Sequence, residues 1–244
     1  MSSETISALT GLGHEYEAIA HNLANANTVG FKRKIGVFTQ EPPKVGVGAD
    51  TSASSTSALP ATKATSAIDF SQGRLVQTGR SLDVALSGKG FFVLETSEGE
   101  RYTRNGVFRV NSRGQLVDAS GRSVAGAGGP VVLPPSISQM AVEIGSDGRI
   151  SAGGTPIGAL RIVEFEDPSV LQPEGMGAFV AKGRARPGPA VETTAQQGFQ
   201  EASNVDAVRE LVALIKVTRL YQANVQVMAS KSDRGKDLMR VAMA

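Results

Sequence analysis

Two segments with the spacing of long helices lie at opposite ends of this 244-residue chain and constrain its fold most strongly. In residues 4–31, apolar or small side chains recur at alternating intervals of three and four, at Ile6, Leu9, Gly13, Tyr16, Ala20 and Leu23, before the polar Asn27. Residues 205–240 repeat the pattern at Ala207, Leu211, Leu214, Thr218, Tyr221, Val225 and Met228. This heptad-like stripe is typical of a helix that packs against another helix.

The lengths of the two predicted helices indicate that they extend beyond a small core. At a rise of about 1.5 Å per residue they would be roughly 40 and 50 Å long, which is more than a compact domain of this size needs. Gly11 and Gly13 each cost about 1 kcal/mol relative to alanine inside a helix, so the first helix is marginal alone. We therefore expect an antiparallel or side-by-side pair that forms a coiled-coil-like inner domain.

The pattern changes twice between the helices. Residues 41–67 are rich in serine, threonine, alanine and proline and predict a low-complexity linker or extended segment. From residue 68 to about residue 182, short apolar runs alternate with glycine-containing turns. Within this region, Asn105-Gly106 is a strong signal for a two-residue hairpin turn. Connections this short predict antiparallel strands, because parallel strands need long crossovers.

The predicted fold class is therefore α+β, with long N- and C-terminal helices in a coiled-coil-like inner domain and an antiparallel all-β middle domain. With 41% hydrophobic residues, the chain can supply a substantial core. We place the N-terminal helix and a following motif at 1–40, the linker at 41–67, the β-rich outer domain at 68–195 and the C-terminal helix at 196–244.

Composition argues against several classes of partner. The formal charge is only +2, from 25 basic and 23 acidic residues, without the clustered basic patch of a nucleic-acid-binding protein. The chain has no cysteine and no apolar run as long as a membrane span, so we expect no direct membrane insertion. Its start lacks the features of a secretory signal. Composition alone predicts a cytoplasmic protein, unless export uses a route that reads no cleavable signal.

Metal and nucleotide sites are not indicated by the motifs. His14 and His21, the only histidines, lie about 10 Å apart along a helix and cannot share one metal ion. Residues 87–90 look superficially like a phosphate-binding loop, but Asp83 stands where its first glycine is needed. Gly90 stands where that loop needs a hydroxyl residue. We expect no cofactor and no metal ion.

Catalytic groups are not indicated either. Residues 121–126 are one residue out of register for a nucleophile elbow, and the β region has no histidine to act as a base. The carboxylates of Glu164, Glu166 and Asp167 have the character of a solvated strand end. The sequence therefore predicts no catalytic residue and no enzyme.

Three blocks of the sequence resemble a known family. Residues 20–32, Ala-His-Asn-Leu-Ala-Asn-Ala-Asn-Thr-Val-Gly-Phe-Lys, closely resemble the N-terminal motif of the flagellar rod and hook proteins. Residues 68–92 and 102–117 are similar to the first β segment of that family. Residues 197–224, with Gln197-Gly-Phe199 and Ser203-Asn-Val-Asp206, resemble its C-terminal helix motif. The blocks stand at both ends and in the centre, in the family's order.

The resemblance implies a structural subunit of the bacterial flagellar basal-body rod, the drive shaft that transmits torque from motor to hook. It implies self-association in a helical filament and contacts with other rod and hook subunits, the surrounding ring proteins and the flagellar type III export apparatus. It also implies a place in the periplasm-spanning rod and export without a cleavable signal peptide. The alternatives are a hook or other hook-basal-body axial protein, or a secreted β-rich binding protein.

The helical stripes and the N- and C-terminal motifs together predict an assembly interface. Asparagine side chains both donate and accept hydrogen bonds and can set the register between helices, while Ala20, Ala24 and Ala26 permit close approach. The predicted interface residues of the first segment are Ile6, Leu9, Tyr16, Asn22, Leu23, Asn25, Asn27, Thr28, Gly30 and Phe31. Those of the second are Asn204, Val205, Leu211, Leu214, Tyr221, Asn224, Val225 and Met228.

Overall fold

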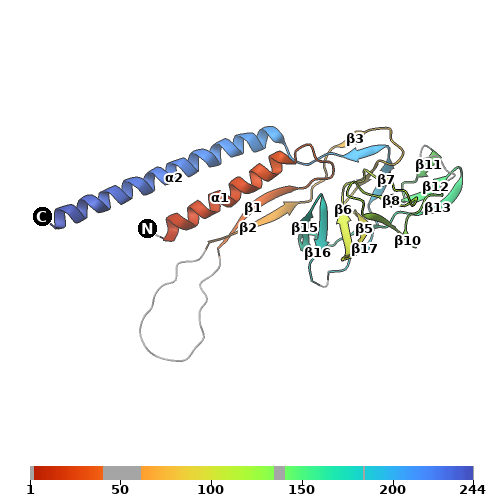
Figure 1. Ribbon diagram of the computed structural model, residues 1–244, viewed down its shortest axis with the longest axis horizontal. Helices are drawn as coiled ribbons and strands as arrows, with labels where there is room; N and C mark the ends of the chain where they lie inside the picture. Colours follow the sequence, from red (N-terminus) through yellow and green to blue (C-terminus); the bar gives the residue numbers. More distant parts are fainter. Residues whose placement is uncertain (1–2, 41–61, 135–140, 184, 244) are drawn as a thin grey trace, which may run out of the picture. The chain divides into compact units, whose positions relative to one another are not determined.

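The computed structural model describes residues 3–40, 62–134, 141–183 and 185–243, which fold into two units (Figure 1). We call the first the helical unit, because it holds both helices together with a two-stranded sheet. The second, the β unit, consists of residues 24–33 and 68–206. Residues 41–61, which make up most of the predicted linker, lie outside the described residues. The predicted domain limits therefore stay a prediction.

The helical unit contains α1 (Ser3–Ala24), α2 (Ala207–Ala242) and a sheet of β1 (Arg33–Gln40) and β2 (Thr62–Asp69). Helix α2 lies close to the predicted range of 205–240, but α1 ends well before residue 31. After α1 the chain turns, because the Thr28 amide donates to the Asn25 carbonyl oxygen at 3.0 Å and Gly30 has a φ of +69°. A left-handed residue cannot continue a right-handed helix.

The predicted fold class is wrong, because the two helices do not form a coiled-coil-like inner domain. The described chain is mostly β-strand, with an all-β middle and two α-helices. A coiled coil needs side chains that interlock along its whole seam. Gly13 occupies a seam position of α1, yet a Cβ atom there would meet nothing within 4 Å. The seam is therefore open at this point.

A ten-stranded sheet forms the centre of the β unit, in the order β15-β16-β6-β5-β9-β8-β7, with β10 on β9 and β14 joined to β5 and β17. All of its described strand pairs are antiparallel. The strands are β5 (Phe91–Thr96), β6 (Gly99–Thr103), β7 (Arg109–Val110), β8 (Leu116–Val117), β9 (Ser123–Gly126), β10 (Gly129–Pro130), β14 (Ile162–Glu164), β15 (Leu171–Gly175), β16 (Ala178–Ala181) and β17 (Gly188–Pro189). A short 3-10 helix, Pro168–Val170, precedes β15.

Strand β5 runs through the middle of this sheet and is buried on both faces. Phe92 and Leu94 belong to one hydrophobic core, whereas Phe91 and Val93 belong to a second core. The alternation follows from the two-residue period of a strand. In the first core, the Phe92 ring packs edge-on against Phe108, with ring centroids 5.1 Å apart. A continuous apolar run therefore marks a strand that is covered on both sides.

The Asn105-Gly106 pair does not form the predicted hairpin turn. Strand β6 pairs with β5 and β16, while β7 pairs with β8. Gly106 serves a different purpose, since a Cβ atom there would lie 1.7 Å from the Val84 carbonyl oxygen. The Asn105 side chain accepts a hydrogen bond from the Val107 amide at 3.0 Å, which closes a local turn. This glycine is required by close approach of two segments, not by a hairpin.

Three smaller sheets complete the β unit, and two of them join its end to its beginning. Strands β11 (Val142–Ile144), β12 (Arg149–Ala152) and β13 (Thr155–Ala159) form one sheet. Strand β18 (Thr194–Gln197) pairs with β4 (Val84–Ser87), and β19 (Phe199–Glu201) pairs with β3 (Leu75–Gln77). As a result, residues 199–204 lie beside residues 69–77.

Candidate functional site

Residues from three distant parts of the β unit meet at the buried carboxylate of Glu201, the last residue of β19. Its Oε1 atom accepts hydrogen bonds from the Lys32 ammonium at 2.6 Å and from the Gly73 amide at 2.9 Å. Its Oε2 atom accepts one from the Arg104 guanidinium at 3.5 Å. We call Lys32, Arg104 and Glu201 the charge cluster. Their side chains are 0%, 1% and 0% exposed, so water does not screen them.

The charge cluster holds two cations and one anion away from water. Burial lowers the pKa of the Lys32 ammonium from its ordinary value, although the neighbouring Glu201 opposes this shift. Burial likewise lowers the pKa of the Arg104 guanidinium, again against the attraction of Glu201. The Arg104 guanidinium also lies over the Phe91 ring, 4.9 Å from its centroid. This cation–π contact offsets part of the cost of removing the guanidinium from water.

Two glycines allow backbone segments to approach the charge cluster. The Gly30 amide donates to the Glu201 carbonyl oxygen at 2.7 Å. With its φ of +69°, Gly30 would place a Cβ atom 2.5 Å from the Asn105 amide nitrogen. At Gly73 a Cβ atom would lie 1.9 Å from the Ala202 carbonyl oxygen. A larger residue at either position would have to displace backbone.

Asn204 connects the segments that flank the charge cluster. Its Oδ1 atom accepts a hydrogen bond from the Arg33 amide at 2.7 Å. Its Nδ2 atom donates to the carbonyl oxygens of Asp69 at 2.8 Å and Ser71 at 3.1 Å. The backbone amide of Asn204 donates to the Phe31 carbonyl oxygen at 3.4 Å. A side-chain amide provides the donors and the acceptor that this arrangement needs.

In the helical unit, Asn22 has a comparable role at the end of α1. Its side chain is buried and hydrogen-bonds to the backbone of Lys34 in β1. The same side chain donates to the Glu210 carboxylate in the first turn of α2 at 3.4 Å. Glu210 is itself 1% exposed. These contacts join α1, α2 and β1 at one end of the helices.

The predicted interface residues differ in exposure, and several belong to the interior of the chain's own fold. Ile6 lies on α1, but its side chain is outside the described part. The buried residues are Asn22 and Gly30. The half-buried ones are Leu9, Leu23, Asn25, Thr28, Phe31, Asn204, Val205, Leu214, Asn224 and Met228. The exposed ones are Tyr16, Asn27, Leu211, Tyr221 and Val225.

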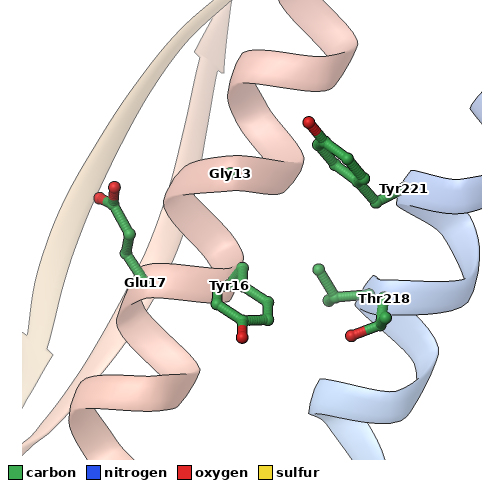
Figure 2. A pocket seen from close by; sticks show the side chains of 6 residues that line it. Gly13, Tyr16, Glu17, Thr218 and Tyr221 are labelled. Atoms are coloured by element: carbon green, nitrogen blue, oxygen red, sulfur yellow. The ribbon is translucent and has the colours of Figure 1, made fainter. Parts of the chain in front are cut away.

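A groove lies between α1 and α2 inside the helical unit (Figure 2). Its volume is about 390 Å³, and Gly13, Tyr16, Val217, Thr218 and Tyr221 are among its lining residues. Figure 2 shows Tyr16 on α1 and Thr218 and Tyr221 on α2 on either side of the space. Both tyrosines are about half exposed. The groove therefore presents an apolar lining to solvent.

Helix α2 carries a second apolar face that the heptad analysis missed. Val212 and Ile215 are 48% and 54% exposed. The buried Val217 lies about half a helical turn from both of them, on the opposite side of α2. The signal was present in the sequence, because Val208, Val212 and Ile215 have the same four-then-three spacing as the predicted stripe. Exposed apolar side chains therefore cover two sides of the helix.

Sequence reasoning also missed the charged residues that organise the site. Lys32, Arg104 and Glu210 were part of the recognised blocks but were not predicted to be buried, and Glu201 was not singled out. Charged side chains are rarely buried unless they are paired, so each is expected at the surface. Glu201 ends β19, which pairs with β3, and its contacts with Lys32 and Arg104 join residues that are distant in the sequence.

Two other kinds of site are absent from the described residues. No group of three or more histidine, cysteine, aspartate or glutamate side chains there is arranged to hold a metal ion. In the same part of the chain, neither helix combines the length and the apolar character that crossing a membrane requires.

Three protein-family models match the chain. The model described as flagella basal body rod protein matches residues 6–32, and the flagellar hook protein FlgE/F/G D1 domain matches residues 85–152. The flagellar basal body rod FlgEFG protein C-terminal model matches residues 196–240. Lys32, Arg104 and Glu201 each fall in a different one of these regions. The charge cluster therefore joins all three matched regions.

Curated relatives are similar over nearly the whole chain. The flagellar basal-body rod protein FlgF of Caulobacter vibrioides is 32% identical over 91% of this chain and 89% of its own length. FlgF of Escherichia coli is 31% identical over 88% of this chain and 86% of its own length. The rod protein FlgG of Bacillus subtilis is 29% identical over 97% and 96%. This chain belongs to the flagellar basal-body rod protein family.

Proposed function

We propose that this protein is a structural subunit of the flagellar basal-body rod, which polymerises helically with its own copies and with other rod and hook subunits. The observation that carries the proposal is the exposure of apolar side chains on α2. Soluble monomers rarely expose contiguous apolar surface of this kind. Burying one isoleucine or leucine side chain contributes about 1.5–3 kcal/mol, so a helix with this surface gains stability when neighbouring subunits cover it.

Two different surfaces of the helical unit take part in the proposed assembly. One is the groove that Gly13, Tyr16 and Tyr221 line, and the other is the apolar face formed by Val212 and Ile215. A repeated contact between unlike surfaces forms a ring when its rotation closes and an open helical filament when it does not, and the proposed assembly is the open filament. The exposed residues of the predicted interface, such as Leu211 and Val225, lie on the same helix.

The buried residues of the predicted interface act indirectly in this proposal. Asn22 and Gly30 stabilise the positions of the end segments within the subunit, while Tyr16, Leu211 and Val225 meet the neighbours. Membership of the rod family supports a place in the periplasm-spanning rod and torque transmission from motor to hook. It also supports delivery by the type III export apparatus without a cleaved signal, and contact with the surrounding ring proteins.

Replacement of Ile215 by glutamate tests the proposal. Because Ile215 is 54% exposed in the subunit, Ile215→Glu should leave the far-ultraviolet circular dichroism and thermal unfolding of the purified monomer unchanged. In cells whose motility depends on this chain, the variant should be missing from isolated basal bodies, and swimming should stop. A glutamate buried between subunits would be an unpaired charge in an apolar contact.

The matched control is Val191→Glu, which makes the same change at a residue of the β unit that is 83% exposed. This variant should assemble and support motility like the unmodified chain. If Ile215→Glu were incorporated into basal bodies as well as Val191→Glu, then this face of α2 would not be an assembly surface.

A further inference from the structure

The charge cluster contains more positive than negative charge, which makes Glu201 its most important member. Lys32 and Arg104 bring two positive charges to a site where Glu201 is the only carboxylate, among the described residues, that hydrogen-bonds to either of them. Their other acceptors are neutral carbonyl oxygens, from Ser71 at 2.7 Å and Gly88 at 2.7 Å. Asp69 attracts Lys32 and Glu164 attracts Arg104 more weakly than Glu201 does. Glu201 is therefore the main counter-charge of both buried cations.

Removal of one member of such a cluster has unequal effects. When a buried charge loses its partner, the remaining charge stays out of water without compensation, which is strongly unfavourable. Loss of the Glu201 charge leaves two buried cations that repel each other. Loss of the Lys32 charge leaves Arg104 and Glu201 as one balanced pair. The cluster therefore depends more on Glu201 than on either cation.

The segments that carry Lys32 and Glu201 also hold each other through their backbones. The Gly30 amide donates to the Glu201 carbonyl oxygen, and the Asn204 amide donates to the Phe31 carbonyl oxygen. Both segments contact residues 69–73, through the bond from Lys32 to Ser71 and the bond from the Gly73 amide to Glu201. Each segment thus forms part of the surface on which the other is packed.

We propose that Glu201 acts as a charge lock, which makes the packing of residues 28–33 and of residues 199–204 onto the β unit a single cooperative step. If residues 199–204 leave, Lys32 and Arg104 lose their common counter-charge, and residues 28–33 lose two backbone contacts. If residues 28–33 leave, Glu201 loses its shortest ion pair. The first segment follows α1 and the second precedes α2. The lock therefore makes the two segments next to the helices pack onto the β unit together or not at all.

Hydrogen exchange of the full-length monomer, measured by mass spectrometry, tests the lock. In Glu201→Gln, amides of residues 28–33 and of residues 199–204 should both exchange faster, by a common factor on the order of a hundredfold. Amides of β5, which lies in the core of the sheet, should keep their protection. The control Glu143→Gln removes an exposed carboxylate from β11 and should change neither segment.

Faster exchange in residues 199–204 alone, with residues 28–33 still protected, would overturn the proposal, because the two segments would then pack independently. If Glu201→Gln also speeds exchange in β5, the test is repeated with the milder variant Lys32→Met, because it keeps the balanced pair of Arg104 and Glu201. In that variant, the amides of both segments should still exchange faster by a common factor, and this factor should be smaller than in Glu201→Gln. Faster exchange in residues 28–33 alone in Lys32→Met would refute the lock.

Discussion

The side-chain amide of Asn22 pairs with both backbone polar atoms of Lys34, twelve residues further along the chain. Asn22 Nδ2 donates to the Lys34 carbonyl oxygen at 2.8 Å, and the Lys34 amide donates to Asn22 Oδ1 at 2.8 Å. The end of α1 thereby pairs with the start of β1 in the way that a neighbouring strand would. One side chain satisfies a backbone donor and a backbone acceptor.

This pairing predicts a stability loss in Asn22→Ala. The variant leaves the Lys34 amide and carbonyl without their partner, and each such loss costs about 1–3 kcal/mol. We expect the free energy of unfolding of the helical unit to fall by about 2 kcal/mol or more, as measured by urea titration with circular dichroism. Asn27→Ala, at an exposed position, should change it by less than about 0.5 kcal/mol. Equal losses in both variants would contradict this role for Asn22.

The groove in the helical unit predicts opposite effects on monomer and assembly in Gly13→Leu. A Cβ atom at Gly13 meets nothing within 4 Å, and leucine is a better helix former than glycine by about 1 kcal/mol. The monomer should therefore be at least as helical as the unmodified protein. Because the leucine occupies the groove, incorporation into basal bodies should fall sharply.

The control for the groove is His14→Leu, since His14 is exposed on α1 and does not line the groove. It also raises helix propensity, but it should assemble normally. If both leucine variants assembled equally well, the groove would have no role between subunits, although the apolar face of Val212 and Ile215 could still have one.

The buried Tyr102 predicts a loss of stability at high pH. Its hydroxyl donates to the Glu100 carboxylate at 3.2 Å, and burial, assisted by the Glu100 charge, raises the pKa of Tyr102 from 10.0 to about 12. The folded protein therefore keeps this proton where the unfolded chain has lost it. The resulting stabilisation is complete below pH 10 and disappears as the pH rises toward 12.

Ultraviolet titration should show a tyrosine ionisation at a pH of about 12, and this step should be absent in Tyr102→Phe. The unfolding free energy of the unmodified protein should fall relative to that of Tyr102→Phe as the pH passes from 10 to 12. An ionisation near pH 12 that persists in Tyr102→Phe would contradict its assignment to Tyr102.

The turn between β15 and β16 predicts a stabilising substitution. Met176 has a φ of +47° and is followed by Gly177 with a φ of +70°, between the paired residues Gly175 and Ala178. A two-residue hairpin turn of this kind favours asparagine at its first position, whereas an ordinary side chain there costs roughly 1 kcal/mol. Met176→Asn should therefore raise the unfolding free energy by about 1 kcal/mol in urea titrations.

Val191→Asn is the control for Met176, because it makes an apolar-to-asparagine change at another highly exposed residue whose φ is not positive. No gain is expected there. If both variants gained equally, the effect would come from removing exposed apolar surface and not from the backbone conformation at Met176.

Regular spacing made the two helices and the antiparallel middle predictable, since both signals reside in neighbouring residues. Helix α2 at Ala207–Ala242 follows from a stripe that needs no knowledge of the rest of the chain. The predicted coiled coil was wrong, because a stripe shows that a face will be covered but not what covers it. Gly13 satisfies the spacing of the stripe yet leaves the groove open.

Turn chemistry and burial depend on partners that are distant in the sequence. Asn105-Gly106 has the composition of a hairpin turn, but its glycine is needed where Val84 approaches. Glu201 has no local feature that distinguishes it from a surface carboxylate. Its burial depends on the pairing of β19 with β3 and on Lys32, which lies 169 positions earlier. Single-sequence reasoning therefore found the recognised motifs but not the residue at which they meet.

The pairing of β18 with β4 and of β19 with β3 determines when the β unit can fold during synthesis. Ala195 belongs to the same core as Leu82 and Phe92, so a ribosome-bound chain cannot complete that core until nearly all of the subunit has emerged. Contacts over such long sequence separations also slow folding. The nascent subunit therefore remains without a finished core for most of its translation.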